Sequence, residues 1–302
     1  MIRYFLILII PVFIFSQNKK VFYYVENDST ISYRDEKNNF VIPPFQTYKY
    51  LVRNDLHKSE ITENFFCIYP KNEQEYAVNK QGNFLFYPFY YDNGPDYIKE
   101  NYIRIKDKNG KVGFANKEGK IIIFPKYDFA TPFNMGFSSY CNGCYFDRKK
   151  DEEHPPLVGG TWGYIDINGN EIPPTKKSKN SKDCILRDGS YIPYQFSYSK
   201  YELSLLNKIL KFKKEINQNN LSEGSRINFE IISKPSESNP YYFIKYYKMD
   251  KPNYFSSDFD DQEGFNFYID KDENIFVNHL VIDNDKNSYH YELIKIEDWI
   301  KK

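Results

Sequence analysis

Short apolar segments alternate with polar turns through the first 175 residues of the chain. The clearest unit is WGYIDINGNEIPP at 162–174, and related units occupy 112–140 and 76–92, with a weaker one at 31–48. Each unit has an aromatic strand, a turn rich in Asn, Lys and Gly, a second apolar strand, and then proline with an aromatic residue. Such turns accept positive φ at low cost and join antiparallel strands. The pattern therefore predicts tandem β-hairpins.

The spacing of apolar residues becomes helical from Ser199 to Asn217, and Ser199 with Glu202 forms the sequence of a capping box. The residues expected on the apolar face of this helix are Leu203, Leu206, Ile209, Leu210 and Ile216. Strand-like runs with polar turns between them follow at 226–233, 241–249, 265–270, 275–283 and 291–302. This order predicts an α+β domain with one long helix and an antiparallel sheet of four to five strands.

The N-terminus has the anatomy of a secretory signal peptide: Arg3, an apolar run from Tyr4 to Phe15, and the small residue Ser16. We expect cleavage between Ser16 and Gln17, and therefore a secreted or periplasmic protein. The expected organisation is a signal peptide at 1–16, hairpin repeats at 17–175, a polar linker at 176–198 and the α+β domain at 199–302. No second long apolar run follows, so we expect no transmembrane segment after removal of the signal peptide.

Composition supports a mainly β protein and narrows the range of partners. The chain contains 29 Tyr and 26 Phe, and aromatic residues favour strands. Lys plus Arg equals Asp plus Glu at 41 each. Since a nucleic-acid-binding protein requires a basic surface, this balance argues against a nucleic-acid partner.

Residues 111–174 resemble the WG repeat family, whose modules pair a Trp-Gly strand with a later Pro-x-Tyr-Asp segment. The residues that match the first half of this pattern are Trp162, Gly163, Tyr164, Ile165, Asp166 and Gly169. Those that match the second half are Pro125, Lys126, Tyr127, Asp128, Ala130, Phe133 and Gly136. In the preceding unit Val112 replaces the Trp, and the resemblance weakens from there towards residue 75. The resemblance implies an all-β repeat array of non-catalytic modules.

Trp162 and Tyr164 alternate along one strand, so both should face the same way. Because the equivalent positions are apolar in other units, we interpret both as filling the seam between hairpins. The alternative is an exposed aromatic platform that stacks against sugars.

An insertion between 141 and 160 contains Cys141 and Cys144 in a C-x-x-C pattern, followed by His154. Thiolates at this spacing with an imidazole could begin a tetrahedral zinc site, although a fourth ligand is not evident nearby. In an exported protein the competing interpretation is a Cys141–Cys144 disulfide, and free thiols are the third. No other cofactor is expected.

The C-terminal part shows a weak resemblance, in element order only, to cystatin-like and nuclear-transport-factor-2-like domains. The segment DKDEN at 270–274 lacks the Gly and Glu of a calcium loop and is interpreted as a hairpin turn. No HExxH or G-x-S-x-G motif occurs. We therefore expect an exported, non-catalytic module that binds a protein or envelope partner. The alternative is a metal- or small-ligand-binding protein that uses the Cys141/Cys144/His154 loop or the C-terminal sheet.

Overall fold

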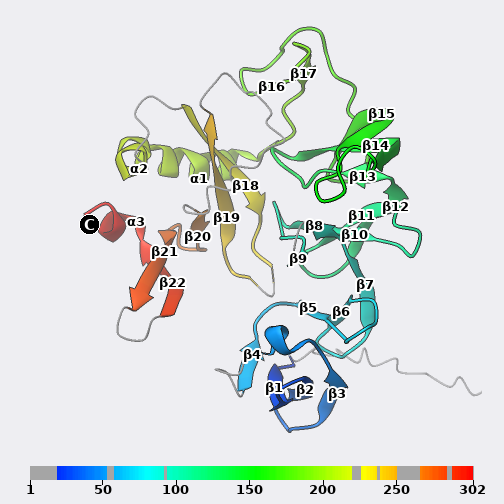
Figure 1. Ribbon diagram of the computed structural model, residues 1–302. Helices are drawn as coiled ribbons and strands as arrows, with labels where there is room; N and C mark the ends of the chain where they lie inside the picture. The colour runs from blue at the N-terminus through cyan, green and yellow to red at the C-terminus, as the bar shows by residue number, and fades with distance from the viewer. Residues whose placement is uncertain are drawn as a thin grey trace, which may run out of the picture. The chain divides into compact units, whose positions relative to one another are not determined.

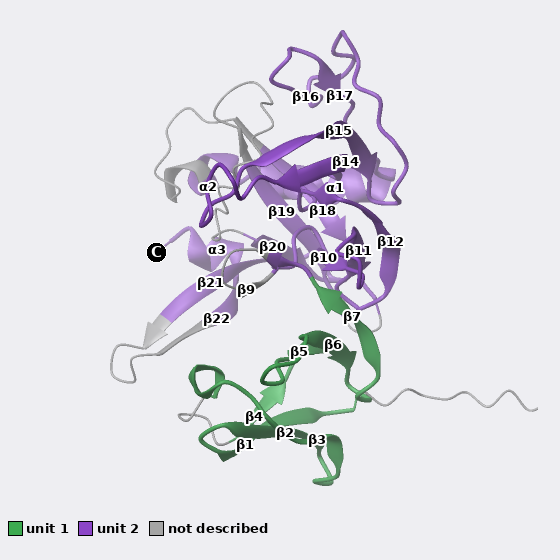
Figure 2. Cartoon of the chain, turned by 45° about the vertical axis from the view of Figure 1, so that its right-hand side comes forward, with its two compact units in different colours: residues 1–88 green, residues 89–302 purple. Residues whose placement is uncertain are grey.

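The computed structural model describes residues 19–52, 58–91, 94–219, 226–236, 239–249, 266–283 and 288–301. The protein is mainly β, with several antiparallel sheets and one long helix, as the sequence predicts (Figure 1). The chain divides into two compact units, residues 1–88 and 89–302, and each is described by itself (Figure 2). The expected signal peptide at 1–16 lies outside the described residues and stays a prediction.

Unit 1 is built from seven antiparallel strands. They are β1 (Val21–Asn27), β2 (Thr30–Asp35), β3 (Phe40–Gln46), β4 (Lys58–Ile61), β5 (Phe65–Ile68), β6 (Tyr76–Asn79) and β7 (Phe84–Pro88), with one 3-10 turn, η1 (Lys49–Leu51). The first four form a sheet of order β3-β2-β1-β4, and β6 pairs with both β5 and β7. Tyr33 lies at the centre of the core, with its ring 4.4 Å from that of Phe66.

The first part of unit 2 contains the hairpins and two small two-stranded sheets, β8–β9 and β16–β17. The strands are β8 (Tyr90–Tyr91), β9 (Gly94–Pro95), β10 (Tyr102–Lys106), β11 (Val112–Asn116), β12 (Ile121–Tyr127), β13 (Phe129–Ala130), β14 (Phe137–Phe146), β15 (Leu157–Asp166), β16 (Cys184–Ile185) and β17 (Tyr191–Ile192). β11 pairs with β10 and β12, and β14 pairs with β13 and β15. Phe114, Phe133 and Ile165 join these hairpins in one buried core.

The last part of unit 2 is a five-stranded antiparallel sheet with helices on one face. Its elements are α1 (Lys200–Leu210), α2 (Lys213–Asn219), β18 (Arg226–Ser233), β19 (Tyr242–Met249), β20 (Asn266–Ile269), β21 (Ile275–Asp283), β22 (Ser288–Lys295) and α3 (Ile296–Trp299), and the strands follow chain order across the sheet. The predicted capping box is present, because Ser199 accepts from the Glu202 N–H and Glu202 accepts from the Ser199 N–H.

The buried face of α1 differs slightly from the prediction. Leu205, Leu206 and Ile209 are buried against the sheet, whereas Leu203 and Leu210 are largely exposed. The predicted helix also breaks after Leu210, and Ile216 reaches the core from α2. The last predicted strand ends at Lys295, where the chain turns into α3 and buries Trp299. The resemblance of this part to cystatin-like and nuclear-transport-factor-2-like domains stays a prediction.

One turn recurs along the chain and gives the sequence pattern its periodicity. Its first residue is Asp or Asn, whose Oδ1 accepts the backbone N–H groups two and four residues later, and its fourth residue has positive φ. In the described residues five turns show the full pattern, and they begin at Asp35, Asn79, Asp107, Asp166 and Asp270. A short polar side chain at the first position thus stabilises each turn locally. The DKDEN segment is one of these turns, which confirms its interpretation as a hairpin.

Residues 176–198, expected to be a linker, are packed into unit 2. β16 and β17 pair with each other, and the buried side chains Cys184, Leu186 and Ile192 share a core with Phe137 and Tyr247. The hairpins from residue 89 onward and the C-terminal sheet therefore belong to the same compact unit, and the domain boundaries expected from the sequence stay a prediction. The apolar residues of this segment are widely spaced among polar ones, so the sequence pattern does not indicate that the segment is packed.

Across the described residues, no helix combines the length and apolar character needed to cross a bilayer.

Candidate functional site

The hairpin β14–β15 carries both the Trp-Gly motif and the two cysteines of the insertion. Cys141 on β14 pairs with Trp162 on β15 and with Phe129 on β13. Residues that are directly opposite each other in an antiparallel sheet project from the same face. The motif and the insertion therefore share one face of a three-stranded sheet.

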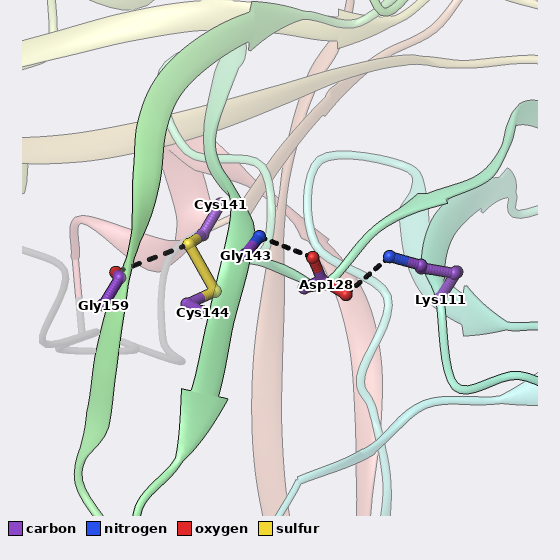
Figure 3. The surroundings of a disulfide bond; sticks show 6 residues. All are labelled: Lys111, Asp128, Cys141, Gly143, Cys144 and Gly159. Atoms are coloured by element: carbon purple, nitrogen blue, oxygen red, sulfur yellow. Dashed lines mark hydrogen bonds and ion pairs between the residues drawn. A yellow bond between two sulfur atoms is a disulfide. The ribbon is translucent and has the colours of Figure 1, made fainter.

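Cys141 and Cys144 are joined by a disulfide bond and are buried (Figure 3). The Cys141 sulfur lies 4.0 Å from the Gly159 carbonyl oxygen on the opposite strand. Gly160 has φ +73°, and a β-carbon there would lie 2.5 Å from that sulfur. The Gly159–Gly160 pair thus lets β15 pass directly beside the disulfide.

Asp128 fastens the cysteine loop to the preceding hairpin (Figure 3). Its Oδ1 accepts from the Lys111 Nζ at 2.6 Å, and its Oδ2 accepts from the Gly143 N–H at 2.6 Å. The hydrogen bond from Lys111, followed by the one from Gly143, lowers the pKa of Asp128. The Asp of the Pro-x-Tyr-Asp segment therefore holds the turn between the two cysteines.

His154, the third residue of the predicted metal site, lies in an exposed turn. Its backbone N–H donates to Asp151 at 2.9 Å. In the part of the chain that the structure describes, no three or more His, Cys, Asp or Glu side chains are grouped as a metal site would require. The two sulfurs are bonded to each other, as the disulfide alternative requires, and zinc binding by Cys141, Cys144 and His154 stays a prediction.

Trp162 does not fill a seam between hairpins, contrary to its expected role. Its side chain is 48% exposed, whereas Val112, at the same motif position in the preceding unit, is 1% exposed. The rings of Trp162 and Phe129 meet edge to face, with their centres 6.2 Å apart. Phe129 also meets Phe146 edge to face, with ring centres 6.0 Å apart, and Phe146 is exposed. These three rings, the aromatic patch below, lie on the face that carries Cys141. Tyr164 does pack inward, against Phe137 at 6.1 Å.

Gly113 and Gly163, the glycines at the Trp-Gly position of the two units, have different structural roles. A β-carbon on Gly113 would lie 2.4 Å from the Ile123 carbonyl oxygen, so Gly113 permits the close approach of β12 to β11. A β-carbon on Gly163 would instead lie 2.7 Å from the ring of Tyr140, its cross-strand partner. Glycine is required at position 113, where backbone occupies the space of a side chain, whereas at position 163 the end of the Tyr140 side chain would have to move.

The aromatic patch lies next to a buried ion pair. Arg104 donates to both carboxylate oxygens of Asp96, at 2.8 Å each, and to the Ala130 carbonyl at 3.0 Å. Its guanidinium carbon also lies 4.3 Å from the ring centre of Phe89, which contacts Phe129. A satisfied ion pair of this kind fixes the position of the rings above it.

A buried carboxylate that no sequence motif marks, Glu100, connects three parts of unit 2. It accepts from the Met135 N–H at 2.6 Å, from the Gly136 N–H at 2.9 Å and from the Tyr247 hydroxyl. Glu100 and Asn101 both have positive φ. Two consecutive turn amides that bind a carboxylate stabilise its charge without a neighbouring cation.

A second buried carboxylate, Glu230 on β18, accepts hydrogen bonds from two tyrosine hydroxyl groups and one lysine ammonium group. It accepts from the Lys182 Nζ at 2.8 Å, from the Tyr198 hydroxyl at 2.6 Å and from the Tyr194 hydroxyl. Burial, followed by the charge of Glu230, raises the pKa of Tyr198 well above its usual value. Both carboxylates are thus hydrogen-bonded within the protein and hold its elements together.

The comparison with protein families identifies one module. The family model "WG containing repeat" matches residues 113–143, which include β11 without its first residue, β12, β13 and β14 as far as Gly143. This match supports the predicted WG repeat over that range. Searches of curated proteins and of solved structures found no significant match.

Proposed function

We propose that this protein is a non-catalytic, exported binding module, and that the aromatic patch of Trp162, Phe129 and Phe146 contacts a protein partner. The observation that carries the proposal is the half-exposed Trp162 on a rigid hairpin. Aromatic side chains that remain exposed on a fixed support are typical of the energetic centres of protein interfaces.

The support beneath the patch is well suited to binding. The disulfide, the Asp128 contacts and the Arg104–Asp96 ion pair restrain β13, β14 and β15 from three sides. A surface that is rigid before binding loses little conformational entropy on association. The two buried carboxylates, Glu100 and Glu230, are engaged by internal donors, in keeping with a binding role rather than catalysis.

Export is the second part of the proposal. Residues 1–16 have the sequence of a signal peptide, and the Cys141–Cys144 disulfide suits an oxidising compartment. Fractionation of producing cells, followed by N-terminal sequencing, should recover a chain that begins at Gln17 outside the cytoplasm. A cytoplasmic chain that retains residues 1–16 would refute export without affecting the binding role.

The binding role is tested by placing a photo-reactive phenylalanine analogue at position 162. We expect a discrete cross-linked protein adduct when the purified chain is exposed to the envelope or medium fraction of its source. The same analogue at Tyr97, which is exposed but outside the patch, serves as the control. The adduct should weaken at least tenfold when Phe146 is also changed to Ala. Equal cross-linking from both positions, or insensitivity to Phe146→Ala, would refute the patch as the interface.

A further inference from the structure

Unit 1 has a surface pocket of about 350 Å³ that is separate from the aromatic patch. Three of its lining residues are aromatic and two are polar, and all lie in β6, β7 or the turn before β6: Glu73, Gln74, Tyr76, Phe84 and Tyr87. Its volume falls within the range of about 300–1,000 Å³ that is usual for small-ligand sites. The pocket is shallow and open to solvent, so it offers room for one end of a small ligand, and the chemistry of the lining indicates which class.

The three rings lie next to one another around Phe84. The ring centres of Phe84 and Tyr87 are 5.1 Å apart and inclined at 60°, and those of Tyr76 and Phe84 are 6.2 Å apart and inclined at 40°. Phe84 is 52% exposed, although it belongs to a strand. All three rings line the pocket, and an aromatic ring attracts positive charge at its electron-rich face.

Glu73 supplies the single carboxyl group among the lining residues. Burial of the Tyr76 hydroxyl and the charge of Glu73 both raise the pKa of Tyr76, which places the carboxylate near that ring. Among the described residues Glu73 forms no ion pair, and no basic side chain lines the pocket. The pocket is therefore negative in both its formal charge and its ring faces.

We propose that this pocket binds a methylated ammonium group, as found in choline. A quaternary ammonium ion combines a positive charge with an apolar methyl surface and is weakly hydrated, so it gains from ring faces and a carboxylate together. A primary ammonium ion would lose stronger hydration on entering. A neutral sugar could stack on the rings and donate its hydroxyl groups to Glu73, so it is the competing ligand that the test has to exclude.

The test compares choline with its uncharged isostere, 3,3-dimethylbutan-1-ol, on the full-length purified protein. Saturation-transfer NMR should show contact for the choline methyl groups, and titration should give a dissociation constant at least tenfold lower for choline than for the isostere. Methyl glucoside serves as the sugar probe and should show no contact. Vesicles of phosphatidylcholine added in a parallel arm establish whether the ammonium group is taken from a lipid head group or only from a free molecule.

Two substitutions locate the site. Phe84→Ala should abolish choline contact, whereas Phe40→Ala should leave it unchanged, since Phe40 is equally exposed at 52% but does not line the pocket. Glu73→Gln keeps the shape and should weaken choline binding about fivefold at low salt, with no effect on the isostere. Equal binding of the isostere, preferred binding of the sugar, absence of choline contact, or an equal loss in Phe40→Ala would each overturn the proposal.

Discussion

The Tyr247 hydroxyl on β19 donates a hydrogen bond to Glu100, a residue 147 positions earlier in the chain. Glu100 lies in the turn before β10 and also binds the Met135 and Gly136 amides of the turn before β14. One carboxylate thus joins two repeat hairpins to the C-terminal sheet. This contact explains in part why residues 89–302 form a single compact unit.

We predict that Tyr247→Phe lowers the free energy of unfolding of the protein by about 1–3 kcal/mol, because a buried acceptor loses one of its donors. Urea denaturation followed by tyrosine fluorescence measures the change. Tyr97→Phe removes the same hydroxyl from a largely exposed side chain and should change stability by less than about 0.5 kcal/mol. Equal effects of the two substitutions would show that the Glu100 contact contributes no stability.

The second prediction compares Gly160 with Gly110. The comparison distinguishes the cost of a left-handed backbone conformation, which both residues have, from the cost of steric overlap, which only Gly160 would have. Gly160 and Gly110 both have positive φ, +73° and +79°, but only Gly160 has neighbours within 4 Å of an added β-carbon. Gly110→Ala should therefore cost about 1 kcal/mol, the usual penalty for a left-handed residue. Gly160→Ala should cost at least about 2 kcal/mol more, since the methyl group meets the Cys141 sulfur and the Cys144 amide.

The measurement for this pair is the free energy of unfolding under oxidising conditions. Repeating it after reduction provides the control, because a reduced Cys141 can move away from the added methyl group. The difference between the two glycine variants should then shrink. A difference that persists unchanged would place the steric conflict elsewhere than at the disulfide.

The structural elements that could be predicted from sequence depend on local chemistry. Asp166 and Gly169 determine their turn through contacts two to four residues apart, and Ser199 with Glu202 determines the start of α1 in the same way. Such contacts join residues that are close in the sequence, so the sequence alone predicts them.

The elements that could not be predicted depend on which distant strand lies opposite. Trp162 and Val112 occupy the same motif position, yet one is exposed and the other buried, because different segments cover β15 and β11. The role of Glu100 could not be predicted for the same reason, since its partner Tyr247 is distant in the sequence. The positive φ of Glu100 was equally invisible, because Glu rarely adopts it.

Trp162 gives the third prediction, which separates its role from that of a core residue. Trp162→Ala should lower the free energy of unfolding by about 2 kcal/mol, short of the roughly 3–5 kcal/mol of a buried Trp, because half of the side chain already contacts solvent. Val112→Ala should cost about as much, roughly 2 kcal/mol, although it removes far fewer atoms, since Val112 is fully enclosed. Urea denaturation of both variants measures the two costs, and a cost of about 3–5 kcal/mol for Trp162→Ala would restore the interpretation of Trp162 as a seam residue.

The four cysteines should fall into two reactivity classes. Burial raises the pKa of Cys184 to about 12 and that of Cys67 to about 11, so neither thiol is ionised near pH 8. Iodoacetamide should label no cysteine of the native oxidised protein, two after denaturation without reduction, namely Cys67 and Cys184, and all four after denaturation with reduction. Intact-mass spectrometry counts the labels.

The same sample tests the zinc hypothesis for Cys141, Cys144 and His154. A disulfide predicts a native mass two units below that of the reduced chain and no stoichiometric zinc. Bound zinc would instead appear by elemental analysis and disappear in Cys141→Ser with Cys144→Ser. The double substitution should cost roughly 2 kcal/mol of stability, because the disulfide closes only a short loop.

Asp128 gives a prediction with a defined pH window. Hydrogen bonds from Lys111 and Gly143 hold the pKa of Asp128 below its usual value, so the ionised carboxylate stabilises the folded state. This contribution is complete above about pH 4, the pKa in an unfolded chain, and is lost as the pH falls through the lower folded-state pKa. Asp128→Asn should therefore be less stable than the parent at pH 7, and the difference should shrink as the pH falls from about 4 to 2. Asp28→Asn, which removes a carboxylate from an exposed pair with Lys49, is the control and should show little difference at any pH. A deficit of Asp128→Asn that stayed constant down to pH 2 would mean that the charge of Asp128 does not hold the cysteine loop.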